Sequence, residues 1–309
     1  MKTTLVVLTL FCSAAASAQN ATPFKNAQTG RSYKSLQAAV DSIGTGQGTI
    51  VIAPGTYRQC AVQKSGVIAF RAVIPGQSIL DGKICNKKAA LVLRGQEARI
   101  DGMVFQNMRT PDSNGAGIRL EKGNLTVTRA VFRNSEQGIS TLDDKAGEIR
   151  IDQSSFSGLG NCGKGLPCTH GIDIGVYRSL TVTKSRFERG NGGDYVKSRA
   201  SAVTINDNAF DDSRGRNSAY MINLSVGAVG RIARNIFVHS RYGDMRRVFI
   251  AVAPDGRTQS SEALSINANE ATLAQGDDKM AVFLADWSGD GIALGGNRLG
   301  RGIKPFEKR

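Results

Sequence analysis

The clearest pattern along the chain is an aliphatic residue followed five positions later by phenylalanine. It occurs at Ile100 and Phe105, Val127 and Phe132, Ile151 and Phe156, Val182 and Phe187, Ile205 and Phe210, and Ile232 and Phe237. Ile266 and Ala271 form a degenerate further copy. The phenylalanines are 27, 24, 31, 23 and 27 residues apart, so the unit is constant in its strands and variable in its loops. Such a repeat predicts stacked structural units.

A second set of apolar positions lies nine to twelve residues before five of these aliphatic residues. The set consists of Gly117-Ile118, Gly138-Ile139, Gly171-Ile172, Tyr195-Val196 and Met221-Ile222. A unit of two or three short strands, rich in Val, Ile and Thr, cannot bury its own apolar face. Stacked coils can bury it, so the pattern predicts an all-β solenoid.

Asparagine recurs three positions after the aliphatic residue, at Asn208, Asn235 and Asn269. We expect each to occupy a bend that visits the left-handed region, with the side-chain amides stacked in a ladder. This role is structural, so these residues are assigned no chemistry.

A short helix is predicted before the repeats, from Leu36 to Ile43, capped by Ser35 and ended by Gly44. Leu36, Ala39, Val40 and Ile43 form its apolar face. A helix at this place would cover the open end of the first coil.

The chain resembles the right-handed parallel β-helix superfamily that includes the pectate lyases. The resemblance lies in the order of SLQAAVDSIGTGQGTIVIAPGTY and coils such as LTVTKSRF and VTINDNAF. A narrower resemblance, to exported bacterial β-helix proteins of unassigned activity, lies in THGIDIG, GGDYVKSRA and SAYMINLSVGAVGRIARNIF. It implies a single-domain right-handed parallel β-helix with a short N-terminal capping helix, and it supplies no catalytic motif.

Four segments are predicted along the chain. Residues 1–18 are a secretory signal peptide, with Lys2 before an apolar run and a small-residue cleavage site that ends at Ala18. An N-terminal extension follows over 19–34, the β-helix with its cap over 35–300, and a solvated basic tail over 301–309. No later stretch is apolar enough to cross a membrane. We therefore expect a monomeric secreted or periplasmic protein without membrane insertion.

The formal charge of +14 becomes +13 when cleavage removes Lys2. This balance favours anionic partners through long-range attraction. For an exported protein the expected partner is an acidic polysaccharide rather than nucleic acid. General basicity of exported proteins explains the charge equally well.

Four cysteines remain after cleavage, an even number suited to an oxidising compartment. The predicted disulfides are Cys60 with Cys85, about one repeat apart, and Cys162 with Cys168, which bracket the loop GKGLP. Zinc is disfavoured because the chain has two histidines and no CxxC pair. No cofactor is expected.

The candidate site lies on the outward face of the earlier strands. If Ile118, Ile139, Ile172, Val196 and Ile222 point inward, one outward column contains Arg119, Ser140, Asp173, Lys197 and Asn223. Adjacent rungs are about 4.8 Å apart, so Asp173, Lys197 and Asn223 should be direct neighbours. Tyr195 and Arg199 are expected to flank Lys197 on the same face.

These residue types suit β-elimination on a uronate, which needs a base and a group that neutralises the carboxylate. Lys197 is a candidate base, because Arg199 and burial favour a neutral amine, although Asp173 favours the ammonium. Tyr195 or Tyr220 is the alternative base or acid. Arg199 and Asn223 would then hold the carboxylate. A solvated ladder of ion pairs is the competing interpretation.

His170, Asp194 and Tyr220 each lie two residues before an inward residue and should line the loop edge of this face. His170 is either catalytic or a structural hydrogen-bonding residue. Asp173 with Asp194 could bind calcium, but two carboxylates are few for the about six to eight oxygen ligands of that ion. The loop from Ser157 to Thr169 either walls a cleft or is a tolerated insertion.

Three classes of function remain open. The first is a polysaccharide lyase, or an epimerase that uses the same proton abstraction. The second is a carbohydrate-binding or scaffold protein without turnover. The third is a glycoside hydrolase, which the lack of the NTD, GHG and RIK motifs of polygalacturonase-like glycosidases disfavours. An inverting hydrolase also needs two carboxyls that face one another. The DD pairs of this chain fall in predicted loops and do not single out such a pair.

Overall fold

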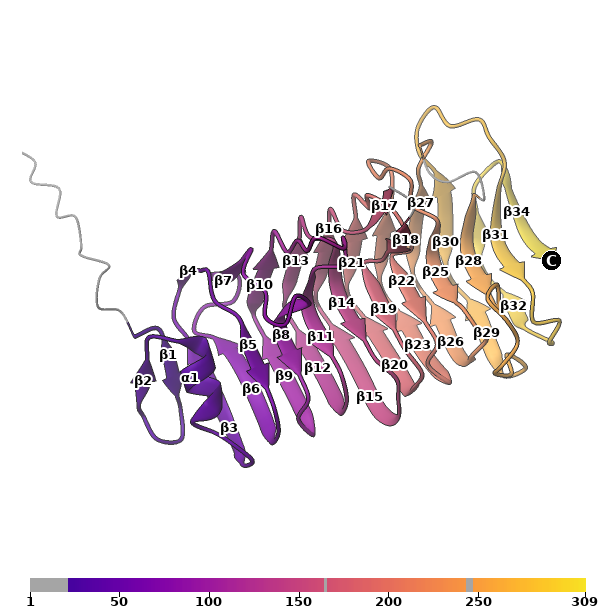
Figure 1. Cartoon of the computed structure of the whole chain (residues 1–309). Helices are drawn as coiled ribbons and strands as arrows, with labels where there is room; N and C mark the ends of the chain where they lie inside the picture. Colours follow the sequence, from indigo (N-terminus) through magenta and orange to yellow (C-terminus); the bar gives the residue numbers. More distant parts are fainter. Residues whose placement is uncertain (1–21, 164–165, 243–246) are drawn as a thin grey trace, which may run out of the picture.

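The computed structural model describes residues 22–163, 166–242 and 247–309. The chain winds through three long sheets, here called sheets A, B and C, and each coil passes through C, then A, then B. Figure 1 shows the coils as successive rungs of one elongated solenoid. The predicted signal peptide, residues 1–18, lies outside the described residues.

The strands pair in parallel throughout, apart from β1 and β2 at the N-terminal end of sheet A and the small hairpin of β17 and β18. In spatial order, sheet A contains β2 (Ser32–Tyr33), β1 (Phe24–Asn26), β3 (Gln47–Ile52), β6 (Val67–Ala72), β9 (Glu97–Asp101), β12 (Asn124–Thr128), β15 (Asp144–Asp152), β20 (Tyr177–Thr183), β23 (Ala202–Asn206), β26 (Val229–Ala233), β29 (Leu264–Asn267) and β32 (Ala293–Gly295). Sheet B contains β4 (Gly55–Tyr57), β7 (Ser78–Asp81), β10 (Met103–Gln106), β13 (Val131–Arg133), β16 (Ser155–Ser157), β21 (Arg186–Glu188), β24 (Ala209–Asp211), β27 (Ile236–His239), β30 (Glu270–Leu273) and β33 (Arg298–Leu299).

Sheet C carries the candidate site. It contains β5 (Ala61–Gln63), β8 (Ala89–Leu93), β11 (Ala116–Leu120), β14 (Gln137–Thr141), β19 (Ile172–Ile174), β22 (Val196–Ser198), β25 (Tyr220–Leu224), β28 (Val248–Val252), β31 (Ala281–Asp286) and β34 (Ile303–Lys308). The hairpin consists of β17 (Asn161–Gly163) and β18 (Leu166–Thr169). This architecture confirms the predicted right-handed parallel β-helix.

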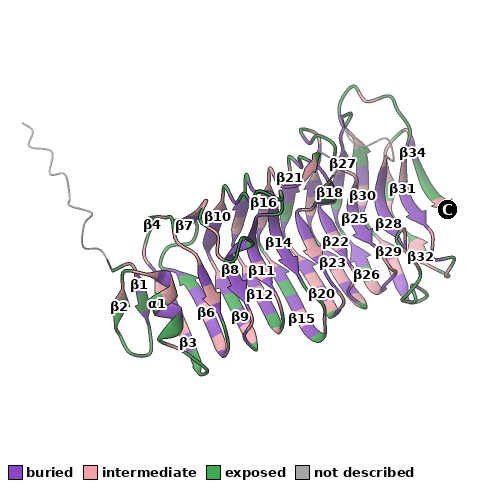
Figure 2. Ribbon diagram, viewed as in Figure 1, coloured by how far each residue is buried: buried purple, intermediate pink, exposed green. Residues whose placement is uncertain are grey.

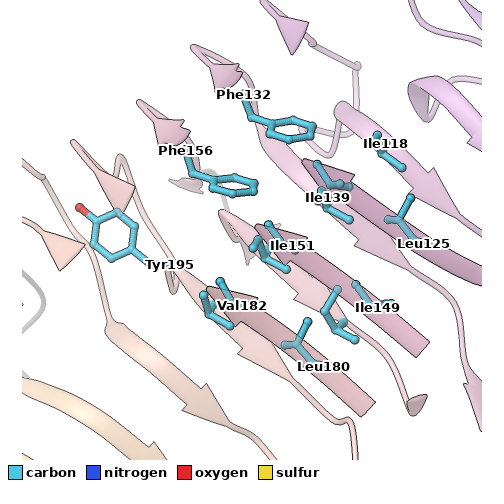
Figure 3. Packing of buried hydrophobic residues seen from close by; sticks show 14 of the residues in the cluster. Ile118, Leu125, Phe132, Ile139, Ile149, Ile151, Phe156, Leu180, Val182 and Tyr195 are labelled. Atoms are coloured by element: carbon cyan, nitrogen blue, oxygen red, sulfur yellow. The ribbon is translucent and has the colours of Figure 1, made fainter. Parts of the chain in front are cut away.

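The repeat of aliphatic and phenylalanine residues sets the register of the coils. The aliphatic residues pair with one another along sheet A from Ile100 to Ile266, and the phenylalanines pair along sheet B from Phe105 to Phe237. Consecutive phenylalanine rings stack with centroids 4.7 to 5.0 Å apart. Figure 3 shows part of this interior, and Figure 2 shows the buried positions running along the strands. The degenerate copy also fits, because Ala271 pairs with Phe237.

The predicted asparagine ladder is present at the bend between sheets A and B. The Asn208 side chain donates to Asn235 Oδ1 at 3.0 Å, and Asn235 donates to Asn269 Oδ1 at 3.0 Å. The left-handed conformation, however, falls on the residue before each asparagine, as at Asp207 (φ 61°) and Arg234 (φ 54°). The bend therefore visits the left-handed region as predicted, one residue before the asparagine. The preceding residue makes the turn, and the amide then points inward.

Strands lie close to both ends of the described residues. Within the predicted extension over 19–34, residues 22–34 contribute β1 and β2, which extend sheet A by antiparallel pairing. Within the predicted basic tail over 301–309, β34 pairs in parallel with β31, and all its residues except Ile303 are exposed or partly exposed.

A short helix, α1 (Leu36–Asp41), lies close to the predicted place and ends two residues earlier than expected. Its first turn is capped by Ser35 Oγ, which accepts from Ala38 N at 3.4 Å. Leu36, Ala39 and Val40 are buried. No helix of the described residues has the length and apolar character needed to cross a membrane.

Both predicted disulfides are present. The Cys60 to Cys85 bond links neighbouring coils, with Cα atoms 5.6 Å apart. The Cys162 to Cys168 bond closes the loop that carries β17 and β18, with Cα atoms 4.4 Å apart. Residues 164–165 of this loop lie outside the described part of the chain.

Candidate functional site

The outward column of sheet C has the register that the sequence predicted. Ser140 pairs with Asp173, Asp173 with Lys197, and Lys197 with Asn223. Arg119 pairs with Ser140 at the other end of the column. Consecutive coils therefore place these polar side chains one rung apart on the solvent face of the sheet.

Tyr195 does not join this column. It is 4% exposed, and its ring packs edge-on against Phe187 and Phe210, with centroids 6.3 and 6.4 Å away. Figure 3 shows the ring inside the solenoid. Tyr195 precedes β22 at the bend between sheets B and C, where strict alternation does not apply. The expectation that Tyr195 points outward is therefore wrong.

The same bend position explains two glycines of the repeat. Gly117 and Gly138 occupy the rungs that correspond to Tyr195, and a Cβ on either would lie within 2.8 to 3.0 Å of a stacked phenylalanine ring. Glycine leaves room for the phenylalanines in these coils. In the later coil the tyrosine fills this interior position instead.

Most of the other predicted residues meet in one cleft. His170, Asp194, Lys197, Tyr220 and Asn223 line a hollow of about 360 Å³ on the outer face of sheet C. They come from the start of β19, from β22 and its preceding bend, and from β25. Bonded residues 24 to 29 positions apart along the chain are thus brought together by the stacking of three coils.

Asp194 is the buried acceptor of the cleft. It is 4% exposed, and its Oδ1 accepts from Tyr220 N at 3.0 Å while its Oδ2 accepts from Asn223 Nδ2 at 2.9 Å. Burial alone would raise the pKa of Asp194, but interactions with His170, Asn223 and the Tyr220 backbone lower it below its ordinary value. The carboxyl is therefore ionised at neutral pH.

His170 is held by Asp194 through its Nδ1 atom. This atom lies 2.9 Å from Asp194 N and 3.2 Å from Asp194 Oδ2. One nitrogen cannot serve both contacts in the same state, since it accepts from the backbone N–H when bare and donates to the carboxylate when protonated. When Nδ1 carries the proton in the neutral ring, Nε2 keeps the lone pair and can act as a base.

Lys197 has a counter-ion that the sequence did not indicate. Its Nζ lies 3.0 Å from Asp255 Oδ2, and Asp255 follows β28 on a later coil. The Lys197 side chain is 21% exposed and that of Asp255 is 50% exposed. The pair suits a charged ammonium at the cleft better than a neutral amine.

An aromatic wall completes the cleft. Trp287 follows β31 and packs against a small apolar cluster on the outer face of sheet C formed by Tyr220, Val248, Ala251 and Ala285. The Arg309 guanidinium lies over the indole, with its Cζ 5.6 Å from the ring centroid. An aromatic wall beside a few polar side chains is typical of a ligand-binding pocket.

The disulfide loop forms the other wall. Cys162, Pro167 and Cys168 line the cleft, and Gly193 N donates to Cys162 Sγ at 3.1 Å. Gly193 has φ 65°, and a Cβ there would contact Thr169 O and His170 Nδ1. The loop thus presses against the backbone that carries Asp194, as expected for a wall rather than a free insertion.

Besides Tyr195, two further predicted residues lie outside the cleft. Arg199 is 3.8 Å from Asp143 Oδ1, and its carbonyl oxygen accepts from Gln259 Nε2 at 2.6 Å. Asp173 remains in the outward column beside Lys197 but does not line the hollow. Arg199 is therefore not placed to hold a substrate carboxylate beside His170.

No cluster of potential metal ligands occurs in the part of the chain that the structure describes. Three or more His, Cys, Asp or Glu residues with suitable geometry do not occur together there. Asp194 has both carboxylate oxygens engaged by protein donors. Asp173 and Asp194 are thus not arranged as a ready calcium site.

Sequence reasoning missed Asp255 and Trp287. Both come from coils after the phenylalanine repeat has degenerated, where no repeated offset assigns the outward positions. One signal was available, because Trp287 is the chain's single tryptophan and lies two residues after an alanine of sheet C. A lone tryptophan beside a predicted sugar site is a reasonable candidate for its wall.

Two solved structures are similar to the chain. One, a PL6 family alginate lyase named AlyGC, has a TM-score of 0.47 and 12% identity over 86% of this chain and 39% of the lyase. The other, a new PL6 alginate lyase in complex with a trisaccharide, has a TM-score of 0.40 and 14% identity over 86% of this chain and 57% of the lyase. The chain thus spans less than two thirds of either lyase.

No curated protein sequence matches the chain. The family model described as the right handed beta helix region matches residues 76–244. The match covers more than half of the 309 residues and coincides with the coils that carry the stacked phenylalanines. The chain therefore belongs to the right-handed β-helix family.

Proposed function

We propose that this protein is an exported carbohydrate-active β-helix protein that cleaves an acidic polysaccharide by β-elimination. Epimerisation of a uronate through the same proton abstraction is the related outcome. The observation that carries the proposal is the convergence of the His170 and Asp194 pair, Lys197, Tyr220 and Trp287 on one cleft. These groups supply a base, a cation, an acid and a sugar platform.

His170 is the proposed base. With its Nδ1 proton directed to Asp194 Oδ2, the Nε2 lone pair takes the proton on the carbon next to the uronate carboxylate. The ionised Asp194 then stabilises the imidazolium that forms. Asp194 acts through His170 and is a positioning residue.

Lys197 is the proposed carboxylate partner. Removal of the proton places negative charge on the substrate carboxylate, and an ammonium beside it lowers the energy of that state. Asp255 holds Lys197 at the cleft in the absence of substrate. This role replaces the alternative in which Lys197 removes the proton.

Tyr220 is the proposed acid. As the electron pair of the broken C–H bond forms the new double bond, the glycosidic C–O bond breaks and the leaving oxygen takes a proton. The Tyr220 side chain lines the same hollow as His170 and Lys197. In an epimerase the proton would instead return to the opposite face of the same carbon.

Hydrolysis is less well supported by this geometry. An inverting hydrolase needs two available carboxyls about 6.5 to 9.5 Å apart, with a water between them. Asp194 is buried and uses both oxygens within the protein, which leaves Asp255 as the exposed carboxylate of the cleft. Binding without turnover is an outcome that the experiment below separates from catalysis.

Our first prediction concerns the cleft residues. The mature protein, mixed with a panel that includes alginate and polygalacturonate, should generate the absorbance of an unsaturated uronate. His170→Gln and Lys197→Ala should each lower kcat at least about 100-fold, because each removes a group that acts on the developing charge. Lys184→Ala, an exposed residue at another edge, is the matched control.

The outcomes of this assay differ in kind. A flat trace with retained binding would replace the lyase by a binding protein. New reducing ends without the chromophore would indicate a hydrolase. Altered uronate stereochemistry without chain cleavage would indicate an epimerase. Full activity in His170→Gln would contradict the assigned base.

The cellular context is part of the same proposal. We infer that residues 1–18 direct export, because the charge, the apolar run and the cleavage site match a signal peptide. The two disulfides suit an oxidising compartment. We also propose that α1 caps the first coil, since its buried face is directed against the start of the solenoid.

A further inference from the structure

A second hollow, which shares no lining residue with the cleft, lies along the turns that lead from sheet C into sheet A in the first coils. Its volume is about 550 Å³. Four successive turns contribute to it, at residues 65–66, 95–96, 123–124 and 146–147. We call it the turn groove. It runs along the solenoid axis, because each turn comes from the next coil.

Glycines form the floor of the turn groove. A Cβ on Gly66 would collide with Gly46 O, one on Gly95 would lie 2.5 Å from Gly66 O, and one on Gly123 would collide with Gly95 O. Gly147 continues the row, because its Cβ would lie 3.0 Å from Gly123 O. Close stacking of the coils thus requires a floor without side chains.

Three coils each place one cation beside this floor. Lys64, Arg94 and Lys122 occupy related positions just before the turn glycines. Arg94 uses its Nε in an ion pair with Glu121 at 2.6 Å. Lys64 and Lys122 are exposed and have neither an ion pair nor a side-chain hydrogen bond among the described residues. Two free ammonium groups therefore face one groove.

The turn groove has a defined end. In the next coil Tyr177 fills the corresponding turn, since a Cβ on Gly147 would lie 2.5 Å from its ring. Asp144 also lies at this end, but its carboxylate is already engaged by Gly123 N at 2.8 Å and Ala146 N at 3.2 Å. These two hydrogen bonds disperse the charge of Asp144, so it repels an anion bound near the lysines less than a free carboxylate would.

We propose that the turn groove binds a single strand of acidic polysaccharide, separately from the cleft. Coils repeat about every 4.8 Å, which is close to the advance of one pyranose unit in an extended chain. A polyuronate carries one carboxylate per sugar, so carboxylates along one strand can reach the free ammonium groups of Lys64 and Lys122, which lie two coils apart. The inference rests on the acidic polysaccharide of the proposed function, but it does not depend on cleavage.

The lining favours a glycan over a nucleic acid. Single-stranded nucleic acids bind grooves in which aromatic side chains stack on the bases. The turn groove contains no aromatic residue among the described residues that line it. Thr45, Ser65, Gln96 and Asn124 instead offer hydroxyl and amide groups that suit sugar hydroxyls.

The test is electrophoresis of the full mature protein through gels that contain alginate or polygalacturonate. The double variant Lys64→Gln/Lys122→Gln should bind the polymer about tenfold more weakly, because it loses two charge contacts. Lys83→Gln/Lys184→Gln removes the same charge from exposed lysines away from the groove and should bind as the native chain does. Ala146→Glu, which adds an anion to the groove wall, should also weaken binding.

A cleft variant makes the result specific. Trp287→Ala should retain the retardation that depends on the groove lysines. Equal retardation of the two lysine double variants would overturn the proposal, as would loss of all retardation in Trp287→Ala. Equal lysine-dependent retardation by single-stranded DNA would also overturn it. Retardation that depends on Lys64 and Lys122 supports the groove even if the cleft forms no unsaturated product.

Discussion

Two buried aspartates show how surroundings shift the pKa of one residue type in opposite directions. Asp194 has several partners that favour its ionised form, and its pKa is lowered despite burial. Asp212 is 1% exposed and accepts from Tyr195 Oη at 2.6 Å and from Ser218 Oγ at 2.8 Å. Burial outweighs these bonds and raises the pKa of Asp212 to about 6. Asp194 is thus an anion that its partners stabilise, whereas Asp212 keeps its proton up to about pH 6.

Our prediction for Asp212 follows from this pKa, which lies above the ordinary value of 3.8. Below pH 4 the folded and unfolded chains both hold the proton. Between about pH 4 and pH 6 the unfolded chain loses it first, so stability falls as pH rises. The accumulated penalty is about 3 kcal/mol above pH 6. Asp212→Asn should remove this penalty.

The measurement is urea unfolding of the native chain and Asp212→Asn at pH 4 and pH 7. Relative to the native chain, the variant should gain about 3 kcal/mol in unfolding free energy between the two pH values. Any constant cost of the new amide cancels in this difference. Asp278→Asn, at an exposed position, should show no such change. If the unfolding free energies of the variant and the native chain differ by the same amount at pH 4 and pH 7, the role of Asp212 is contradicted.

Among the elements, the asparagine ladder ties the coils together at the bend between sheets A and B. Asn235 is fully buried, accepts from Asn208 N and Nδ2, and donates to Ile205 O at 2.8 Å and to Asn269 Oδ1 at 3.0 Å. The Asn235 side chain therefore satisfies two backbone groups of the preceding coil and donates to the asparagine side chain of the next coil. The ladder is a repeated device rather than a set of separate turns.

We predict that Asn235→Ala destabilises the protein by about 3 kcal/mol or more, because it leaves several buried polar groups without partners. Asn297→Ala, at the partly exposed end of the ladder, should cost less, since it has no further asparagine rung to support. Urea unfolding of both variants checks the order. Equal losses would show that the ladder contributes no more in its interior than at its end.

The predictability of the elements follows from the repeat. The recurring offset from Val182 to Phe187 fixed strand register, and the column of Asp173, Lys197 and Asn223 followed from it. Alternation failed at Tyr195, because the chain turns a corner there and two successive residues point inward. The partners in the later coils, Asp255 and Trp287, could not be inferred from a repeat that has degenerated.

At the scale of the whole molecule, the solenoid separates the two surfaces that we propose bind anionic sugars. The cleft lies on the outer face of sheet C in the later coils, whereas the turn groove lies along the first coils. Each arises from stacking, which repeats a side chain or a glycine at a fixed rung. Some of the basic residues behind the net charge of +14 thus lie at these two surfaces. The composition alone does not show their positions.

The proposed cap gives the prediction for the molecule as a whole. In a solenoid each coil contacts its neighbours, so losing an end should loosen the nearest coils and leave distant ones intact. Leu36→Ala/Val40→Ala removes two side chains that are 0% and 3% exposed, at a cost of about 3 kcal/mol or more. Hydrogen exchange should then accelerate in β3 and β6 but not in β23 and β26. Ile236→Ala, where the residue is 54% exposed, should change neither region. Uniform acceleration along the chain would mean that α1 is an ordinary part of one cooperative core rather than a cap.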